Sequence, residues 1–226
     1  LEAWMEKNHP GARVTDLGVY ILEDKAGTGE ALADQGYVMV SYTVSSLDGK
    51  ISSTTHKKVA QQIGSYNPSY YYGPVTWMTI STALPVGVED MMKGMKVGGT
   101  RKAVVPAWLM GYDRYTNPDK FFFFNDTATT EIYTITLEGV STDILKSQVD
   151  SMQIYSALHM NKTDSTSYGF YYQQLKEPAD THSFKADTSI YINYTGRLLN
   201  GQVFDTTIAD TAKVHNIYSS LKNRFS

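Results

Sequence analysis

The chain has no cysteine among its 226 residues, which excludes disulfide bonds and thiolate metal sites but selects no cellular compartment. No apolar run approaches the length that a membrane-spanning helix requires. Positive charge is not in excess, because the formal net charge is −3 at pH 7. A nucleic-acid partner is therefore not expected. The apolar fraction of 42% and the charged fraction of 19% are ordinary for a globular protein.

What the chain does contain is an internal repeat. Residues 41–51 read SYTVSSLDGKI and residues 193–203 read NYTGRLLNGQV, at an offset of 152. Each is an alternating strand pattern that runs into Asp-Gly or Asn-Gly, a strong signal for a β-hairpin. Upstream, residues 17–20 and 168–171 match at an offset of 151. One long repeat without shorter periods predicts two related domains rather than a solenoid.

Periodicity also predicts individual elements. Positions 88, 91, 92 and 95 are apolar and fall on one face of a short helix. The polar, tyrosine-rich stretch 52–83 is interpreted as a long flap with one or two short strands. The remaining expected elements are a helix over 1–8, strands over 17–23, 37–47 and 100–105, and a linker helix over 142–160.

Two segments carry a family resemblance. Residues 84–106, LPVGVEDMMKGMKVGGTRKAVVP, combine a strand end, a glycine, a short helix, Gly-Met-x-x-Gly and a strand that ends in Val-Pro. This order resembles the central signature of FKBP-type peptidyl-prolyl isomerases. Residues 192–207, INYTGRLLNGQVFDTT, resemble the opening strand and the Phe-Asp-Ser/Thr motif of the same family. The tandem arrangement after an N-terminal helix is similar to that of bacterial cell-envelope members.

The resemblance implies an α+β fold. We expect an FKBP-like twisted antiparallel sheet of about five strands wrapped around one short helix, followed by a linker helix and a partial second copy. The expected divisions are an N-terminal helix and linker at 1–16, a complete first domain at 17–140, a linker helix at 141–167 and a truncated second domain at 168–226.

The family's reaction is the cis–trans isomerisation of X–Pro bonds. Amide resonance imposes a rotation barrier of about 18–20 kcal/mol, and an apolar pocket can favour the twisted amide by excluding water. No bond breaks, so the resemblance implies no catalytic acid, base or nucleophile, no metal and no cofactor. It implies proline-containing polypeptides as partners, macrolide-type ligands of the pocket, and a periplasmic or cell-envelope location. Membrane attachment would come only from an anchor outside this sequence.

The resemblance assigns substrate-binding residues to both copies. The matching positions are Tyr42, Leu84, Pro85, Val88, Tyr112 and Tyr133 in the first copy, and Tyr194, Phe204 and Asp205 in the second.

The first copy also departs from the family pattern. Ser52 and Ser53 stand where the family has Phe-Asp, and Pro85 has no N–H where a backbone donor usually binds the ligand. A degenerate first pocket is therefore expected. A non-catalytic peptide-binding or chaperone module stays open as an alternative, as does a surface glycan-binding protein that uses the tyrosines of 66–72.

Residues 121–134, FFFFNDTATTEIYT, break the binary pattern of the chain. Part of the stretch resembles the translation of a short-read sequencing adapter. We treat a foreign origin of this segment as a hypothesis, with a natural aromatic loop near the pocket as the alternative.

Overall fold

The computed structural model describes residues 1–33, 35–79, 83–111, 129–161, 164–166, 169–179 and 183–219. The chain divides into two compact units, which are Leu1–Tyr66 with Tyr72–Ile144, and Asn67–Tyr71 with Leu145–Ser226. In the described part of the chain, no helix combines the length and the apolarity that crossing a membrane requires.

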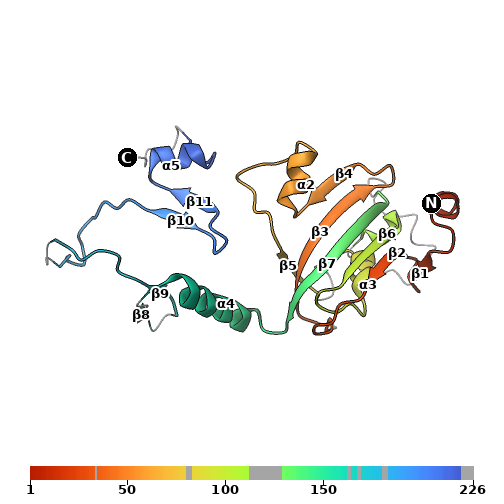
Figure 1. The fold of residues 1–226 in the computed structure, drawn as a ribbon, viewed down its shortest axis with the longest axis horizontal. Helices are drawn as coiled ribbons and strands as arrows, with labels where there is room; N and C mark the ends of the chain where they lie inside the picture. The colour runs from red at the N-terminus through yellow and green to blue at the C-terminus, as the bar shows by residue number, and fades with distance from the viewer. Residues whose placement is uncertain are drawn as a thin grey trace. The chain divides into compact units, whose positions relative to one another are not determined.

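The first unit is an α+β structure built on one antiparallel sheet (Figure 1). The strand order is β1-β2-β6-β7-β3-β4, and β5 also pairs with β3. The described residues thus give seven strands where about five were expected, because β1 extends one edge and β4 and β5 share the other edge of β3. The strands are β1 (Arg13–Val14), β2 (Tyr20–Lys25), β3 (Tyr37–Ser46), β4 (Ile51–Thr54), β5 (Val75–Met78), β6 (Thr100–Val105) and β7 (Glu131–Ser141).

The short helix predicted within 84–106 is confirmed as α3 (Val86–Met92). It packs closely on the sheet: a Cβ added at Gly87 would lie 2.5 Å from a Val105 methyl of β6 and 2.8 Å from Leu109. Only glycine allows this approach without displacing β6 or the following 3₁₀ turn η1 (Ala107–Leu109). Met91 and Met92 of α3 are buried in the same core as Val38 and Val40 of β3.

The two faces of the sheet carry different cores. Ala103 and Val105 of β6 contact the α3 side, whereas Val104 points to the other face because side chains alternate along a strand. There Val104 packs with Ile132 and with Met5 of the N-terminal helix α1 (Glu2–Asn8). Helix α1 therefore closes a second, smaller core of the first unit.

A buried arginine ties α3 to the sheet. Arg101 of β6 is 8% exposed and makes a two-pronged contact with the Asp24 carboxylate of β2, at 3.0 and 2.8 Å. Its remaining nitrogen donates to the carbonyls of Met91 and Lys93, at 2.7 and 2.8 Å. These two carbonyls lie at the end of α3, so one side chain satisfies acceptors that the helix itself leaves open.

The second unit contains short elements. The helix expected over residues 142–160 is present as α4 (Ile144–His159). The other elements are β8 (Asp164–Ser165), β9 (Tyr171–Tyr172), β10 (Thr195–Arg197), β11 (Val203–Thr206) and α5 (Ala209–Val214).

The hairpins of the two units share one register. Adding 152 to each partner in the β3–β4 ladder gives the partners of the β10–β11 ladder, and the irregularity falls after Val44 in one and after Gly196 in the other. Upstream, adding 151 to the β1–β2 pairs gives the β8–β9 pairs. The repeat that is visible in the sequence therefore has a geometric counterpart at the level of individual residue pairs.

Two helices differ from the sequence interpretation. Helix α2 (Lys57–Gln62) lies within the stretch interpreted as a flap, and α5 follows the last predicted motif, where no further pattern was expected. Each helix has only six residues, and each buries a single alanine, Ala60 or Ala212. A six-residue helix that buries one small side chain gives almost no periodic signal.

Residues 131–134, the end of the suspected foreign segment, form the start of β7 and pair with both β6 and β3. The preceding residues 121–128 lie outside the described residues.

Candidate functional site

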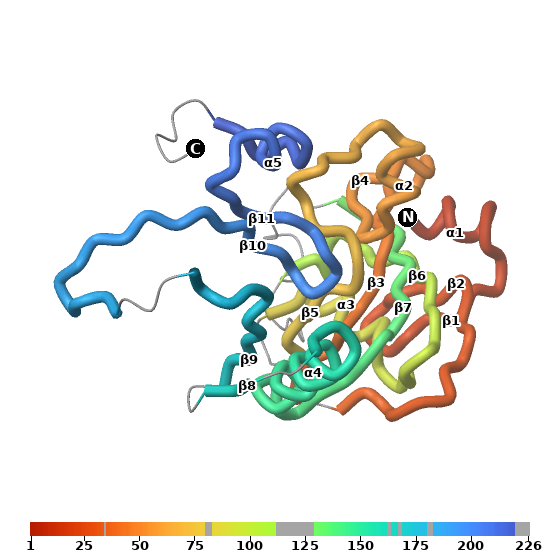
Figure 2. The backbone as a smooth tube through the Cα atoms, turned by 60° about the vertical axis from the view of Figure 1, so that its left-hand side comes forward, coloured from red at the N-terminus to blue at the C-terminus, as the bar shows by residue number. Residues whose placement is uncertain are grey.

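Strands β3 and β7 run side by side (Figure 2) and place two of the predicted tyrosines on one face of the sheet. Tyr133 lies opposite Val44, and Tyr42 shares the Val44 face because side chains alternate. Both tyrosines are half-buried and pack against the core that contains α3. The Tyr133 hydroxyl donates to Glu131 Oε2 at 3.1 Å.

Trp77 of β5 joins this face, although the sequence pattern does not single it out. Its ring centroid lies 5.0 Å from that of Tyr42, with the ring planes inclined by 37°. Trp77 is placed there because β5 pairs with the first half of β3. The signal that could have found it is the alternation of Val75 and Trp77 within an otherwise polar stretch.

The start of α3 forms the adjoining part of the site. Val88 is 1% exposed and lies within the core, whereas Leu84 and Pro85 are half-buried. Pro85 has no N–H, and the next N–H, that of Val86, donates to the Gly111 carbonyl at 2.9 Å. Neither position therefore offers a free backbone donor to a ligand.

Two further apolar side chains of the site, one aromatic and one a methionine, follow β6 in the chain. Trp108 and Met110 are half-buried and pack against the same core as Tyr42 and Leu84. They escape sequence reasoning because the segment after Pro106 has no regular period. Tyr112, the next predicted site residue, lies outside the described residues.

The two hairpins differ in one polar pair. In the first, Ser53 Oγ lies 3.5 Å from the Tyr42 hydroxyl, at the limit of a hydrogen bond. In the second, the Tyr194 hydroxyl donates to Asp205 Oδ2 at 2.6 Å. Ser53 therefore occupies the position equivalent to Asp205, whose carboxylate accepts a hydrogen bond from the tyrosine of its own hairpin.

The three predicted residues of the second copy lie on its hairpin. Tyr194 precedes β10, and Phe204 and Asp205 belong to β11. Phe204 is 59% exposed, and its ring lies so close to Gly196 that a Cβ there would approach it to 2.7 Å. These residues are thus neighbours on one hairpin, while Tyr42, Leu84, Pro85, Val88 and Tyr133 belong to the first unit.

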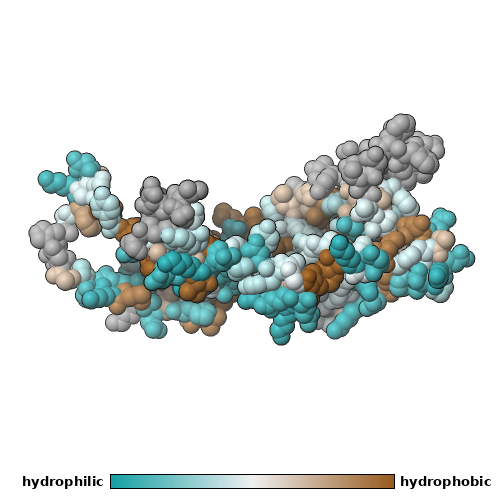
Figure 3. Space-filling view, turned by 90° about the horizontal axis from the view of Figure 1, so that it is seen from above, coloured by the Kyte–Doolittle hydropathy of each residue, from teal (hydrophilic) through white to brown (hydrophobic). Residues whose placement is uncertain are grey.

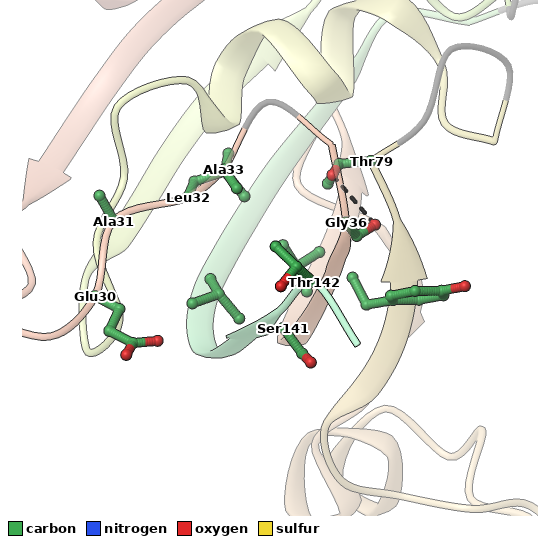
Figure 4. Close-up of a pocket in the computed structure, with 11 residues that line it drawn as sticks. Glu30, Ala31, Leu32, Ala33, Gly36, Thr79, Ser141 and Thr142 are labelled. Carbon is green, nitrogen blue, oxygen red and sulfur yellow. Dashed lines mark hydrogen bonds between the residues drawn. The ribbon is translucent and has the colours of Figure 1, made fainter. Parts of the chain in front are cut away.

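A separate cavity of about 210 Å³ lies at another end of the sheet, where β3 begins and β7 ends (Figure 4). Residues 30–33 and 141–142 line it, with Gly36 and Thr79. Thr79 closes one side, because its N–H and its hydroxyl both donate to the Gly36 carbonyl, at 2.9 and 3.3 Å. None of the predicted site residues lines this cavity.

Charged groups contribute little to the candidate site. Over the described ranges, no three His, Asp or Glu side chains gather closely enough to hold a metal ion. Asp48, in the β3–β4 turn, accepts hydrogen bonds from the Ser46 hydroxyl and the Lys50 N–H. These bonds hold the pKa of Asp48 below its ordinary value, with the Ser46 bond as the largest cause.

The fold and site define an α+β module in which an antiparallel sheet packs around one short helix and aromatic side chains gather beside that helix. Similar solved structures are FkpA from Escherichia coli, a peptidyl-prolyl cis-trans isomerase from Pseudomonas syringae, and the three FKBP domains of wheat FKBP73. FkpA is 22% identical with a TM-score of 0.44, over 62% of this chain and 57% of its own. The Pseudomonas protein is 22% identical with a TM-score of 0.43, over 62% of this chain and 90% of its own.

The wheat protein is 17% identical with a TM-score of 0.39, over 58% of this chain and 50% of its own. The chain thus spans a little over half the length of the FkpA chain, at 57%. No protein-family model and no curated protein sequence matches it.

Proposed function

We propose that the first unit binds proline-containing polypeptides and accelerates cis–trans isomerisation of their X–Pro bonds, as an FKBP-type peptidyl-prolyl isomerase or folding helper. The observation that carries the proposal is the contact between Tyr42 and Trp77, both packed on a core that includes Val88 of α3. The sequence signature of residues 84–106 supports the same assignment. Its clients would be secreted or cell-envelope proteins, and macrolide-type ligands would compete for the same surface.

The chemistry needs no reactive side chain. Rotation about the amide passes through a twisted state that has lost its resonance and much of its charge separation. An apolar surface that excludes water favours this state over the planar amide. Half-buried rings such as Tyr42 and Trp77 can hold a prolyl ring, and the Tyr42 hydroxyl can orient a carbonyl of the substrate.

A second candidate function is peptide binding without catalysis. It is favoured by the 3.5 Å separation between Ser53 and the Tyr42 hydroxyl, and by the engagement of the Val86 N–H with Gly111. Both features leave the site with fewer fixed polar groups than the family pattern implies. Binding of an X–Pro peptide by the full chain without faster isomer exchange would establish this alternative.

The test is exchange spectroscopy on an X–Pro peptide with the full chain. Trp77→Leu, which removes the aromatic wall, is expected to lower kcat/KM by about tenfold, equivalent to ~1.4 kcal/mol. Thr76→Val is the matched control, because Thr76 is the exposed neighbour on the same strand. Exchange by the wild-type chain at the uncatalysed rate would refute isomerase activity. An equal effect of both variants would refute the assignment of the site.

A further inference from the structure

The cavity at the start of β3 and the end of β7 is separate from the proposed isomerase site. All of its lining residues belong to the first unit, and neither Tyr42 nor Trp77 is among them. Its volume is about 210 Å³, whereas an apolar cavity of roughly 150 Å³ is large enough to hold benzene. The space therefore fits one side chain or one small organic molecule.

Backbone contacts of the folded unit define two walls of this cavity. Residues 30–33 form one wall, and the Leu32 N–H donates to the Met95 carbonyl at 3.0 Å. On the other side, Gly36 lies so close to Ser141 that a Cβ at Gly36 would be 2.7 Å from the Ser141 carbonyl oxygen. The segment after α3 and the end of β7 therefore both fix the shape of the cavity.

Three polar side chains of the lining offer hydrogen-bond acceptors rather than donors. The Thr79 side chain is buried, and its hydroxyl donates to the Gly36 carbonyl. The Ser141 hydroxyl donates to the Asp143 carbonyl at 2.8 Å. Because a hydroxyl has one proton, both oxygens can only accept a further hydrogen bond in this arrangement. The exposed carboxylate of Glu30 likewise offers acceptors alone.

Apolar side chains complete the lining. Leu32 and Val140 are half-buried and Val38 is buried, and all three line the cavity. In the view of Figure 4, Leu32 lies between Glu30 and Thr79. The cavity therefore combines apolar walls with acceptors, one of which carries a negative charge.

We propose that this cavity binds a primary alkylammonium group, with the alkyl stem against the apolar walls and the ammonium at Glu30. An ammonium has three N–H donors and no acceptor, so it complements the acceptors of the lining. Glu30 supplies the opposite charge, and within the described residues it forms no ion pair. The group has two sources, a free small amine or a lysine side chain, whose stem is apolar and whose head is charged. Neither source requires isomerase activity.

The probe is n-butylammonium, titrated into the isotope-labelled full chain and followed by NMR. We expect saturable shift changes at the amides of residues 30–33 and 140–142. The neutral probe n-butanol has the same stem without the charge, and we expect it to bind more weakly by about threefold or more. Changes that do not saturate, equal binding of the two probes, or saturable changes confined to other parts of the chain would overturn the proposal.

Substitutions are needed because apolar patches also lie among hydrophilic residues elsewhere on the surface (Figure 3), where the probe can bind weakly. Glu30→Gln removes the charge and should weaken binding of n-butylammonium by about threefold or more, with n-butanol unaffected. Glu138→Gln is the matched control, since Glu138 is an exposed carboxylate of β7 that does not line the cavity. An equal effect of the two variants would overturn the assignment of Glu30.

A second variant tests the cavity itself. Because Ala33 lines the cavity, a phenylalanine in Ala33→Phe would occupy part of the space and should abolish binding of both probes. Unchanged binding by a folded Ala33→Phe chain would show that the probes bind elsewhere, which is the opposite of the proposal.

A blocked tripeptide, acetyl-Gly-Lys-Gly-amide, distinguishes the two sources of the ammonium. Tighter binding of the tripeptide than of n-butylammonium, with shift changes at the same amides, would support a lysine side chain of a polypeptide as the ligand. Weaker binding of the tripeptide would support a free amine. Acetylation of the lysine Nζ removes the charge and should weaken the tripeptide by about threefold or more. Unchanged binding after acetylation would contradict recognition of an ammonium.

Discussion

Replacing Ser53 with aspartate would rebuild in the first hairpin the tyrosine–carboxylate pair that the second hairpin already has. Ser53 lies opposite Val44 as Asp205 lies opposite Gly196. The Tyr194 hydroxyl reaches Asp205 at 2.6 Å in the second hairpin. Because the two ladders share their register, an aspartate at position 53 is expected to accept the same hydrogen bond from Tyr42.

The expected gain follows from the exposure of the pair. A hydrogen bond to a charged acceptor contributes roughly 1.5–3 kcal/mol, but Ser53 is exposed and Tyr42 only half-buried. Screening by water reduces the contribution to about 0.5–1 kcal/mol. If the bond also fixes the Tyr42 hydroxyl for catalysis, this free energy corresponds to roughly a two- to fivefold rise in kcat/KM.

The assay is exchange spectroscopy on an X–Pro peptide, combined with thermal unfolding. Thr76→Asp adds the same charge at an exposed position of β5 and is expected to leave both readouts unchanged. A Tm increase in Ser53→Asp without a rise in kcat/KM would show that the pair only stabilises the hairpin. No increase in either readout would refute the inference that shared register implies shared side-chain geometry.

Three further predictions concern packing, charge and pH. Gly87→Ala should destabilise the chain by about 1–3 kcal/mol in urea unfolding, because its Cβ meets a β6 valine methyl at 2.5 Å. Arg101→Leu should cost about 2–4 kcal/mol in the same assay, since the buried carbonyls of Met91 and Lys93 lose their donor and Asp24 keeps only its contact with Arg13. Lys102→Leu removes only the exposed ion pair with Glu23 and should lower the free energy of unfolding by less than about 1 kcal/mol. Because the folded-state pKa of Asp48 is lowered, its contribution to the hairpin is present above its unfolded pKa and is lost as pH falls through the folded one. Asn200 occupies the position equivalent to Asp48, but its turn has Leu198 in place of Ser46. The pKa of the aspartate in Asn200→Asp should therefore lie closer to the ordinary value than that of Asp48, as measured by NMR titration.

Local signals were sufficient to predict the elements that are repeated or strongly periodic. The Asp-Gly and Asn-Gly turns predicted both hairpins. The apolar spacing from residue 88 to residue 95 predicted the helix α3, but α3 ends at Met92, so Met95 lies beyond it. Which strand pairs with which was harder to predict from the sequence. β5 is four residues of alternating burial in a polar stretch, and it becomes a strand because the edge of β3 is available to it. Such a strand is determined by its neighbour more than by its own composition.

The candidate site was accessible to sequence reasoning only where a motif marked it. Tyr42 lies on a strand whose alternation predicts its face, whereas Tyr133 was assigned by the family resemblance alone, in a segment that breaks the binary pattern. Trp77 has no such marker, and its contact with Tyr42 depends on the register of β5 against β3. The lack of a free backbone donor at the start of α3 could be predicted only in part. Pro85 shows in the sequence that one N–H is missing, but the hydrogen bond from the Val86 N–H to the Gly111 carbonyl is known only from the structure.

The two hairpins have the same backbone pairing but different side chains, so comparing them shows which side chains that pairing tolerates. They share register, bulge position and turn, yet at equivalent positions one carries Ser52 and Ser53 and the other carries Phe204 and Asp205. The β-sheet geometry is therefore insensitive to these side chains, and selection for folding alone does not require the Phe-Asp pair. Any difference in prolyl binding between Ser53→Asp and the wild-type chain must come from the chemistry of that side chain, because the second hairpin shows that the backbone accommodates it unchanged.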